Sequence, residues 1–173
     1  WKDSRLMEEA MDALGASNRK RKLLFVSWGA ERATREFIGT ELRWISPQRE
    51  VSKVSLFYQA ADVYVHAAKV DTFPNSIIEA LACGVPVVAT AVGGIPEQIE
   101  DGVTGFLTPP GDTKALAVAT SRLLCDFELR SRFSAQAAES ARLRFSLDRQ
   151  ADDYLSWYEQ LVTKRRDSAP GTD

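Results

Sequence analysis

Two carboxylates, Asp71 and Glu79, stand with seven residues between them on either side of a small polar segment. This segment, residues 72–76 (TFPNS), follows an expected strand and opens an expected helix. Backbone N–H groups at a helix start have no helical partner, so they can receive a diphosphate or sugar hydroxyls. A carboxylate accepts two hydroxyl donors at once, which suits the vicinal diols of a ribose or a hexose. The pattern suits an anion site that could receive a diphosphate or sugar hydroxyls.

Each carboxylate also has a purely structural interpretation. Ser76 and Glu79 fit the S-x-x-E capping box, in which the glutamate only closes the start of the helix. Asp71 fits an ordinary loop aspartate in an Asx-turn. His66, at the end of the preceding strand, suits strand-end packing as well as a role in the site. The residues alone leave these alternatives open.

Along the chain, short apolar runs typical of strands alternate with segments of helical periodicity, and this alternation predicts an α/β fold that positions the segment. We expect a Rossmann-like doubly wound parallel sheet with helices on both faces, residues 23–28 (LLFVSW) forming a buried parallel strand. Ligands of such sheets bind outside the carboxyl ends of the strands, which is where residues 67–74 lie. The other expected strands are residues 42–45, 61–66, 85–90 and 106–108.

The expected helices begin with an amphipathic segment that Gly15 would end. The others cover residues 54–60, 75–83, 95–99, 113–125, 128–145 and 147–165. We expect one domain over residues 1–165 and a disordered polar tail over 166–173. A doubly wound domain normally opens with a strand, whereas this chain opens with a helix and begins at Trp1 rather than at methionine. The sequence therefore predicts that the first strand is absent by truncation.

Composition argues against several classes of protein. The 173 residues carry a net charge of −2, which gives no basis for binding nucleic acid. His66 is the single histidine, and Cys83 and Cys125 form no CxxC motif, so zinc sites and disulfide frameworks are poorly supported. Two reduced thiols suit a cytoplasmic protein, and no run of about 18 apolar residues is present.

Residues 56–112 resemble the C-terminal domain of family 4 retaining glycosyltransferases, which have the GT-B fold. The family carries two glutamates with seven residues between them, followed by a segment similar to residues 80–88 (ALACGVPVV). A Gly-Gly turn and a dGxxGfl loop follow, matched here by Gly93-Gly94 and residues 101–107 (DGVTGFL). A weaker similarity extends over residues 2–162.

The resemblance implies a role for each matching position. Glu79 matches the glutamate that holds the ribose hydroxyls of the donor nucleotide. Asp71 falls on the first glutamate, near the transferred sugar, and is the candidate catalytic residue. Lys2 aligns with a lysine that binds the diphosphate, and residues 46–51 lie where the base usually rests. The loop whose backbone contacts the sugar and the diphosphate corresponds to Thr72, Phe73, Pro74, Asn75 and Ser76.

The resemblance also sets the expected function. The chain would be the donor-binding domain of a hexosyltransferase of polysaccharide or glycoconjugate biosynthesis, with a nucleoside diphosphate sugar as substrate and no metal or other cofactor. The acceptor would bind a missing N-terminal domain, through which the parent could lie at the membrane surface, and the fragment alone would be inactive. Asp71 is one methylene shorter than glutamate, so we expect it to tune donor preference. The alternatives are a degenerate, non-catalytic relative and a GT-B sugar-nucleotide epimerase.

The expected last helix carries an apolar, tyrosine-rich stripe at helical spacing. Packing of this stripe on its own domain is the default expectation. If part of the stripe is uncovered, the chain should self-associate through it. The stripe consists of Leu147, Ala151, Tyr154, Leu155, Tyr158, Leu161 and Val162.

Overall fold

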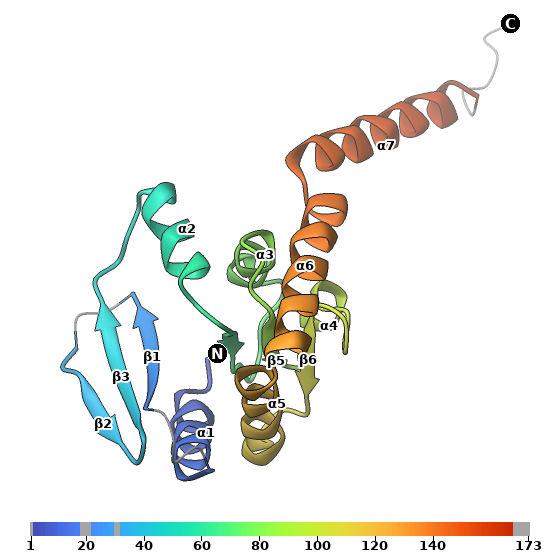
Figure 1. Ribbon diagram of the computed structural model, residues 1–173. Coiled ribbons are helices and arrows are strands. Elements are labelled where there is room, and N and C mark those ends of the chain that lie inside the picture. Colours follow the sequence, from blue (N-terminus) through green and yellow to red (C-terminus); the bar gives the residue numbers. More distant parts are fainter. Residues whose placement is uncertain (1, 18–21, 30–31, 168–173) are drawn as a thin grey trace, which may run out of the picture.

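The computed structural model describes residues 2–17, 22–29 and 32–167. Helices and strands alternate through most of this part of the chain (Figure 1). In chain order the elements are α1 (Ser4–Ser17), β1 (Leu23–Trp28), β2 (Arg35–Phe37), β3 (Thr40–Ile45), α2 (Val51–Gln59), β4 (Tyr64–His66), α3 (Asn75–Ala82), β5 (Val87–Thr90), α4 (Ile95–Gln98), β6 (Gly105–Thr108), α5 (Thr113–Cys125), α6 (Phe127–Arg144) and α7 (Leu147–Asp167).

The strands of the described residues form two three-stranded sheets. One sheet, in the order β4-β5-β6, is entirely parallel. In the other, β1 pairs with β3 in parallel, and β2 pairs with the far side of β3 in antiparallel orientation. The α/β class and the parallel strands confirm the sequence prediction. The β2–β3 hairpin was not predicted, because Arg35–Phe37 is short and partly charged and lacks the apolar alternation of a strand.

Two sequence predictions near the amino end are wrong. Strand β1 was expected to be buried, but Leu24 and Val26, which point to the same face of the sheet, are 51% and 43% exposed. Gly15 does not end α1, which continues to Ser17. It is instead a point of close approach, since a Cβ at Gly15 would lie 1.6 Å from the carbonyl oxygen of Ile38 in the β2–β3 turn.

The apolar core lies on both faces of β5, whose four residues are all buried. Val87 and Ala89 belong to one cluster, which includes Ile77 and Leu81 of α3 and residues of α6. Val88, with the opposite side-chain direction, belongs to a second cluster that includes residues of α1 and α5. This burial fixes the carboxyl end of β5 beside the loop between β4 and α3, where the candidate site lies.

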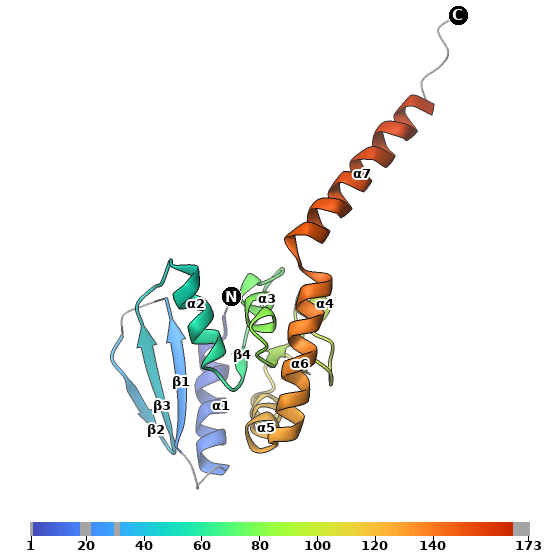
Figure 2. The same cartoon turned by 45° about the horizontal axis from the view of Figure 1, so that its top comes forward.

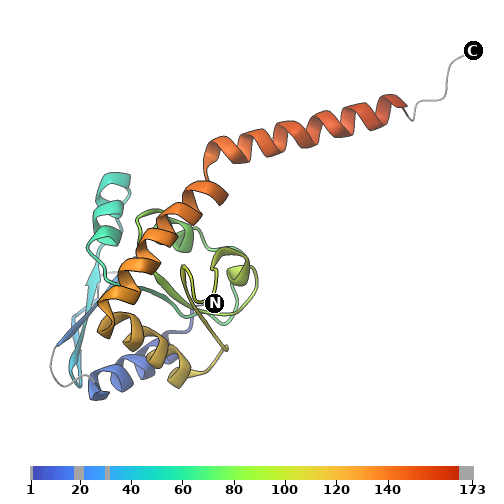
Figure 3. The same ribbon diagram turned by 45° about the vertical axis from the view of Figure 1, so that its right-hand side comes forward.

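Helix α7 leaves the body of the domain and projects away from it (Figures 2 and 3). Every described side chain from Leu147 to Arg165 is exposed. The expectation that its apolar stripe packs on its own domain is therefore wrong; Leu155, Tyr158 and Val162 are all more than half exposed, at 61%, 54% and 52%. The helix continues to Asp167, and the rest of the expected tail lies outside the described residues.

Candidate functional site

The loop between β4 and α3 (residues 67–74) is held at its start by Thr90. We call it the donor loop, because the resemblance found in the sequence implies that the sugar donor would bind there. The Thr90 hydroxyl accepts a hydrogen bond from the Ala68 N–H at 3.0 Å and donates one to the Ala68 carbonyl at 2.8 Å. Both residues are almost fully buried, so water cannot replace either bond. Thr90 therefore fixes the start of the donor loop to the carboxyl end of β5.

The Gly93-Gly94 turn packs directly against the backbone of the donor loop. A Cβ at Gly93 would lie 1.9 Å from the carbonyl oxygen of Asp71, and one at Gly94 would lie 2.1 Å from that of Thr72. The Gly94 N–H donates to the same Thr72 carbonyl at 2.8 Å. Both glycines are thus required by close approach, and Gly93 also has a φ of 53°.

The far end of the donor loop is held by α4. The side-chain amide of Gln98, which is fully buried, donates to the Pro74 carbonyl at 3.1 Å. Pro74 is the N-cap residue of α3. The loop is thereby fixed at its start, its middle and its end before α3 begins.

The start of α3 leaves several backbone donors open. No hydrogen bond to a described residue is recorded for the backbone N–H groups of Phe73, Asn75 and Ser76. These groups lie at the end of the helix that carries positive partial charge, which favours an anion. The capping-box interpretation is wrong: the N-cap is Pro74 rather than Ser76, and no side chain caps this helix.

Glu79 has a different partner from the one that capping would require. The Tyr58 hydroxyl of α2 donates to Glu79 Oε2 at 3.0 Å. Burial raises the pKa of Tyr58, and nearby Tyr64 and Glu79 raise it further, so the phenol remains a donor. Glu79 itself is exposed, so its carboxylate can accept further hydrogen bonds in addition to the one from Tyr58.

Asp71, at the other side of the open amides, contacts His66 of β4. His66 Nε2 lies 3.2 Å from Asp71 Oδ2, and His66 Nδ1 lies 3.2 Å from the Tyr64 hydroxyl. Burial lowers the pKa of His66, and the charge of Lys2 lowers it further, while Asp71 opposes both effects. Lys2 reaches this region because its backbone forms an isolated bridge with Ala68.

A hollow of about 1000 Å³ opens beside the start of α3. Glu79 and Phe73 lie on one side, and the corner between α6 and α7 forms the other. The rings of Phe73 and Phe145 meet edge to face, with their centroids 6.2 Å apart, so the donor loop touches this corner. Residues 46–51, the expected site of the base, run from the end of β3 to the first residue of α2, and none of them lines the hollow.

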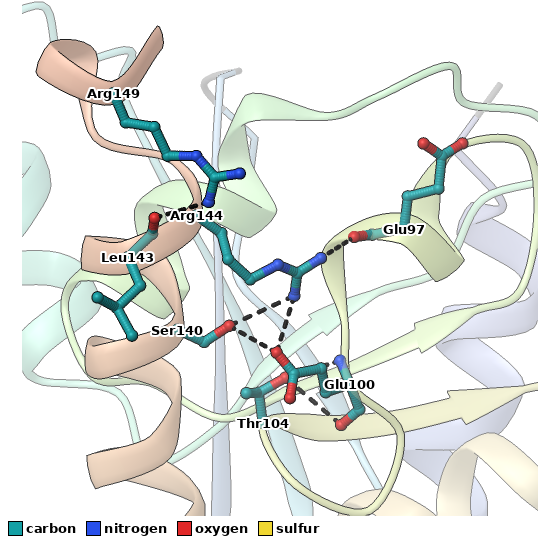
Figure 4. Close-up of polar contacts among 7 residues, drawn as sticks. All are labelled: Glu97, Glu100, Thr104, Ser140, Leu143, Arg144 and Arg149. Atoms are coloured by element: carbon teal, nitrogen blue, oxygen red, sulfur yellow. Dashed lines mark hydrogen bonds and ion pairs between the residues drawn. The ribbon is translucent and has the colours of Figure 1, made fainter. Parts of the chain in front are cut away.

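The corner is fixed by a polar network around Arg144 (Figure 4). Arg144 donates to Glu100 Oε1 at 2.9 Å and to the carbonyl oxygen of Glu97. The Ser140 hydroxyl donates to the same Glu100 oxygen at 2.9 Å. Arg149 of α7 donates to the carbonyl of Leu143 at 2.8 Å. These bonds join α4 and the loop that follows it to the end of α6.

The structure places Asp71 and Lys2 near His66 before residues 72–76, and Glu79 beside Tyr58 after them. The roles assigned to these residues from the sequence stay predictions. Sequence reasoning missed the groups that hold them, which include Tyr58, Tyr64, Thr90 and Gln98. Thr90 carried a signal, since it is a polar residue in an otherwise apolar strand.

Among the described residues there is no group of three His, Cys, Asp or Glu side chains that could hold a metal ion. None of the helices described is long and apolar enough to span a membrane.

Known proteins are similar to this chain in sequence and in fold. The family model for group 1 glycosyl transferases matches residues 1–126. A D-inositol 3-phosphate glycosyltransferase of Saccharomonospora viridis is 38% identical over 127 residues, which cover 73% of this chain and 29% of that enzyme. Sucrose-phosphate synthase from Thermosynechococcus elongatus has a TM-score of 0.73 and 27% identity, over 94% of this chain and 44% of that one. HepE of Anabaena, solved with UDP-glucose, has a TM-score of 0.58 and 29% identity, over 66% and 32%.

The parallel strands and surrounding helices define an α/β domain, and the solved glycosyltransferase structures that it matches share this fold. The chain belongs to the group 1 glycosyl transferase family, which confirms the resemblance found in the sequence. It spans less than a third of the length of the inositol phosphate enzyme that it matches.

Proposed function

We propose that this chain is the donor-binding domain of a retaining glycosyltransferase and that it binds a nucleoside diphosphate sugar at the donor loop. The observation that carries the proposal is the grouping of open backbone amides at the start of α3 between two carboxylates, Asp71 and Glu79. Each carboxylate is held by an aromatic side chain, through one oxygen in each case. The other oxygen of each remains for a ligand hydroxyl.

Each group then has a defined task. Glu79 accepts hydrogen bonds from the ribose hydroxyls, and the open N–H groups of Phe73, Asn75 and Ser76 donate to the diphosphate. The ammonium group of Lys2, whose charge acts on His66, adds positive charge on the side of Asp71. When the glycosidic bond to the diphosphate breaks, the helix amides and Lys2 offset the charge that develops on the leaving oxygen. Asp71 contacts the transferred sugar, and residues 46–51 receive the base.

The acceptor belongs to a second domain in this proposal. Support comes from the inositol phosphate enzyme, which is more than three times as long as the segment that matches. HepE, which was solved with UDP-glucose, is the reason to test a uridine donor first. We expect this chain alone to bind a nucleotide weakly, without a metal ion, and to transfer no sugar.

The test is a calorimetric titration of the chain with UDP, UDP-glucose, GDP and ADP, each with and without Mg²⁺. We expect saturable binding of one nucleotide, lost or at least tenfold weaker in Glu79→Ala because the ribose loses a charged acceptor. Glu159→Ala, which removes an exposed carboxylate on α7 outside the hollow, is the matched control. The proposal fails if the folded chain binds none of the four, or if both variants bind as tightly as the wild type.

A further inference from the structure

His66 is the only histidine of the chain and lies at the end of β4 with 2% of its surface exposed. Its ring carries a hydrogen-bond partner on each nitrogen, Tyr64 on Nδ1 and Asp71 on Nε2. A buried imidazole with both nitrogens engaged has a single orientation and a single tautomer. Most strand-end residues fill space, whereas this one connects the core to a carboxylate of the candidate site.

The direction of these two bonds follows from the chemistry of the partners. An ionised carboxylate only accepts hydrogen bonds, so Nε2 of His66 must donate to Asp71 Oδ2. A neutral imidazole then has Nδ1 as an acceptor, and the Tyr64 hydroxyl donates to it. Burial lowers the pKa of His66, which keeps the ring neutral and the chain of donors directed from Tyr64 to Asp71. Burial likewise raises the pKa of Tyr64.

The bond leaves Asp71 with one committed oxygen and one open oxygen. Oδ1 has no recorded hydrogen-bond partner among the described residues, and the side chain is 27% exposed. An aspartate side chain has one rotatable bond fewer than glutamate, so a single fixed donor is enough to set the direction of its free oxygen. The carboxyl group therefore has a set direction before any ligand arrives.

We propose that His66 is a positioning residue that holds the Asp71 carboxylate toward the transferred sugar, and so determines the affinity for the sugar moiety of the donor but not for the nucleotide. The proposal rests on the proposed function, since it requires the donor to bind at this loop. Glu79 and the open amides contact other parts of the donor, so the loss of His66 should leave them in place. Glu79 is oriented separately, by Tyr58 of α2.

The test compares UDP with UDP-glucose by calorimetry, in the wild type and in three variants of His66. His66→Gln retains an N–H at the depth of Nε2, whereas the shorter His66→Asn cannot reach Asp71. His66→Leu removes the donor and fills the buried position with an apolar side chain. It replaces the asparagine variant if the asparagine variant does not fold. We expect the asparagine or leucine variant to weaken UDP-glucose binding about tenfold relative to UDP, and the glutamine variant to restore most of the difference.

Tyr58→Phe is the reciprocal control, because it releases Glu79 and leaves His66 intact. It should weaken UDP and UDP-glucose by the same factor. If UDP and UDP-glucose weaken equally in the asparagine and leucine variants, or if glutamine behaves as leucine does, the positioning role is refuted while the donor site stands. If the wild type binds none of UDP, UDP-glucose, GDP and ADP, the donor site and the positioning role both fail. If it binds GDP or ADP instead of UDP, the same comparison is made with that nucleotide and its glucose conjugate.

Discussion

Replacing Thr90 by valine removes one hydroxyl and leaves the shape of the side chain nearly unchanged. That hydroxyl makes two hydrogen bonds, to the N–H and to the carbonyl of Ala68, at 3.0 and 2.8 Å. Thr90 is fully buried and Ala68 is 1% exposed, so no solvent can take over the two backbone groups. The substitution therefore leaves one buried donor and one buried acceptor without a partner at the start of the donor loop.

The cost follows from these two groups. An unsatisfied buried polar group costs about 1–3 kcal/mol, and relaxation of the loop recovers part of this, so we expect a loss of about 2–4 kcal/mol. In a chain of this size that loss lowers Tm by roughly 5–15 °C. The N–H and the carbonyl of Ala68 can find new hydrogen-bond partners only if the loop moves away from β5. Thr90→Val should therefore also weaken UDP binding, in addition to destabilising the fold.

Thr120→Val is the matched control. Thr120 is also buried, at 2% exposed, but its hydroxyl makes a single bond to the Leu116 carbonyl within α5, far along the chain from the donor loop. Its loss should cost about 1 kcal/mol or less and leave UDP binding unchanged. Urea unfolding followed by circular dichroism measures the stability of both variants, and calorimetry measures binding. If the two variants lose equal stability, the inference that Thr90 anchors the loop is refuted.

Three further predictions concern the turn, the buried histidine and the exposed helix. Gly94→Ala should lower UDP affinity at least tenfold by displacing the donor loop, whereas Gly102→Ala, which meets no atom within 4 Å, should not; equal calorimetric affinities would contradict this. Because burial lowers the pKa of His66 from 6.5, the unfolded chain takes up the proton first, so the free energy of unfolding should fall as pH drops below about 6.5; urea titrations at pH 7.5 and 5.0 should show a smaller fall for His66→Gln. The uncovered stripe of α7 should drive self-association, which Tyr158→Glu should abolish in sedimentation velocity; a wild type that stays monomeric at high concentration would rule this out.

Local patterns predicted the parts of the fold that depend on local physics. The apolar run that ends at Thr90 gave β5, and Gly84, with a φ of 72°, follows the end of α3 as a helix stop should. Strand β2 was missed because Arg35–Phe37 becomes a strand only by pairing with β3. The exposure of β1 was missed for a related reason, since an apolar run does not reveal whether a neighbouring element covers it.

In the candidate site, too, local patterns predicted some features and tertiary contacts decided the others. The spacing of Asp71 and Glu79 located the loop, but it left capping and ligand binding as equal interpretations of Glu79. The structure rules out capping, because Pro74 is the N-cap of α3 and no side chain caps the helix. The contact of Glu79 with Tyr58, which lies 21 residues earlier in the chain, could not be predicted from the spacing. The projection of α7 was equally invisible, because an amphipathic stripe has the same sequence whether or not its partner is present.

From the sequence, the shorter carboxylate at position 71 was expected to tune donor preference, and the structure adds the contact with His66. A glutamate there would reach about one methylene further and would have to take another rotamer to keep a bond with His66. The aspartate instead accepts from an imidazole that is itself fixed by Tyr64. Thr90 bonds the loop at Ala68, and Gly93 packs closely on the backbone of Asp71, so both residues help to hold the stretch that carries this carboxylate. The departure at Asp71 and the histidine at position 66 are therefore best understood as one paired feature, and substitution of either should be read against the other.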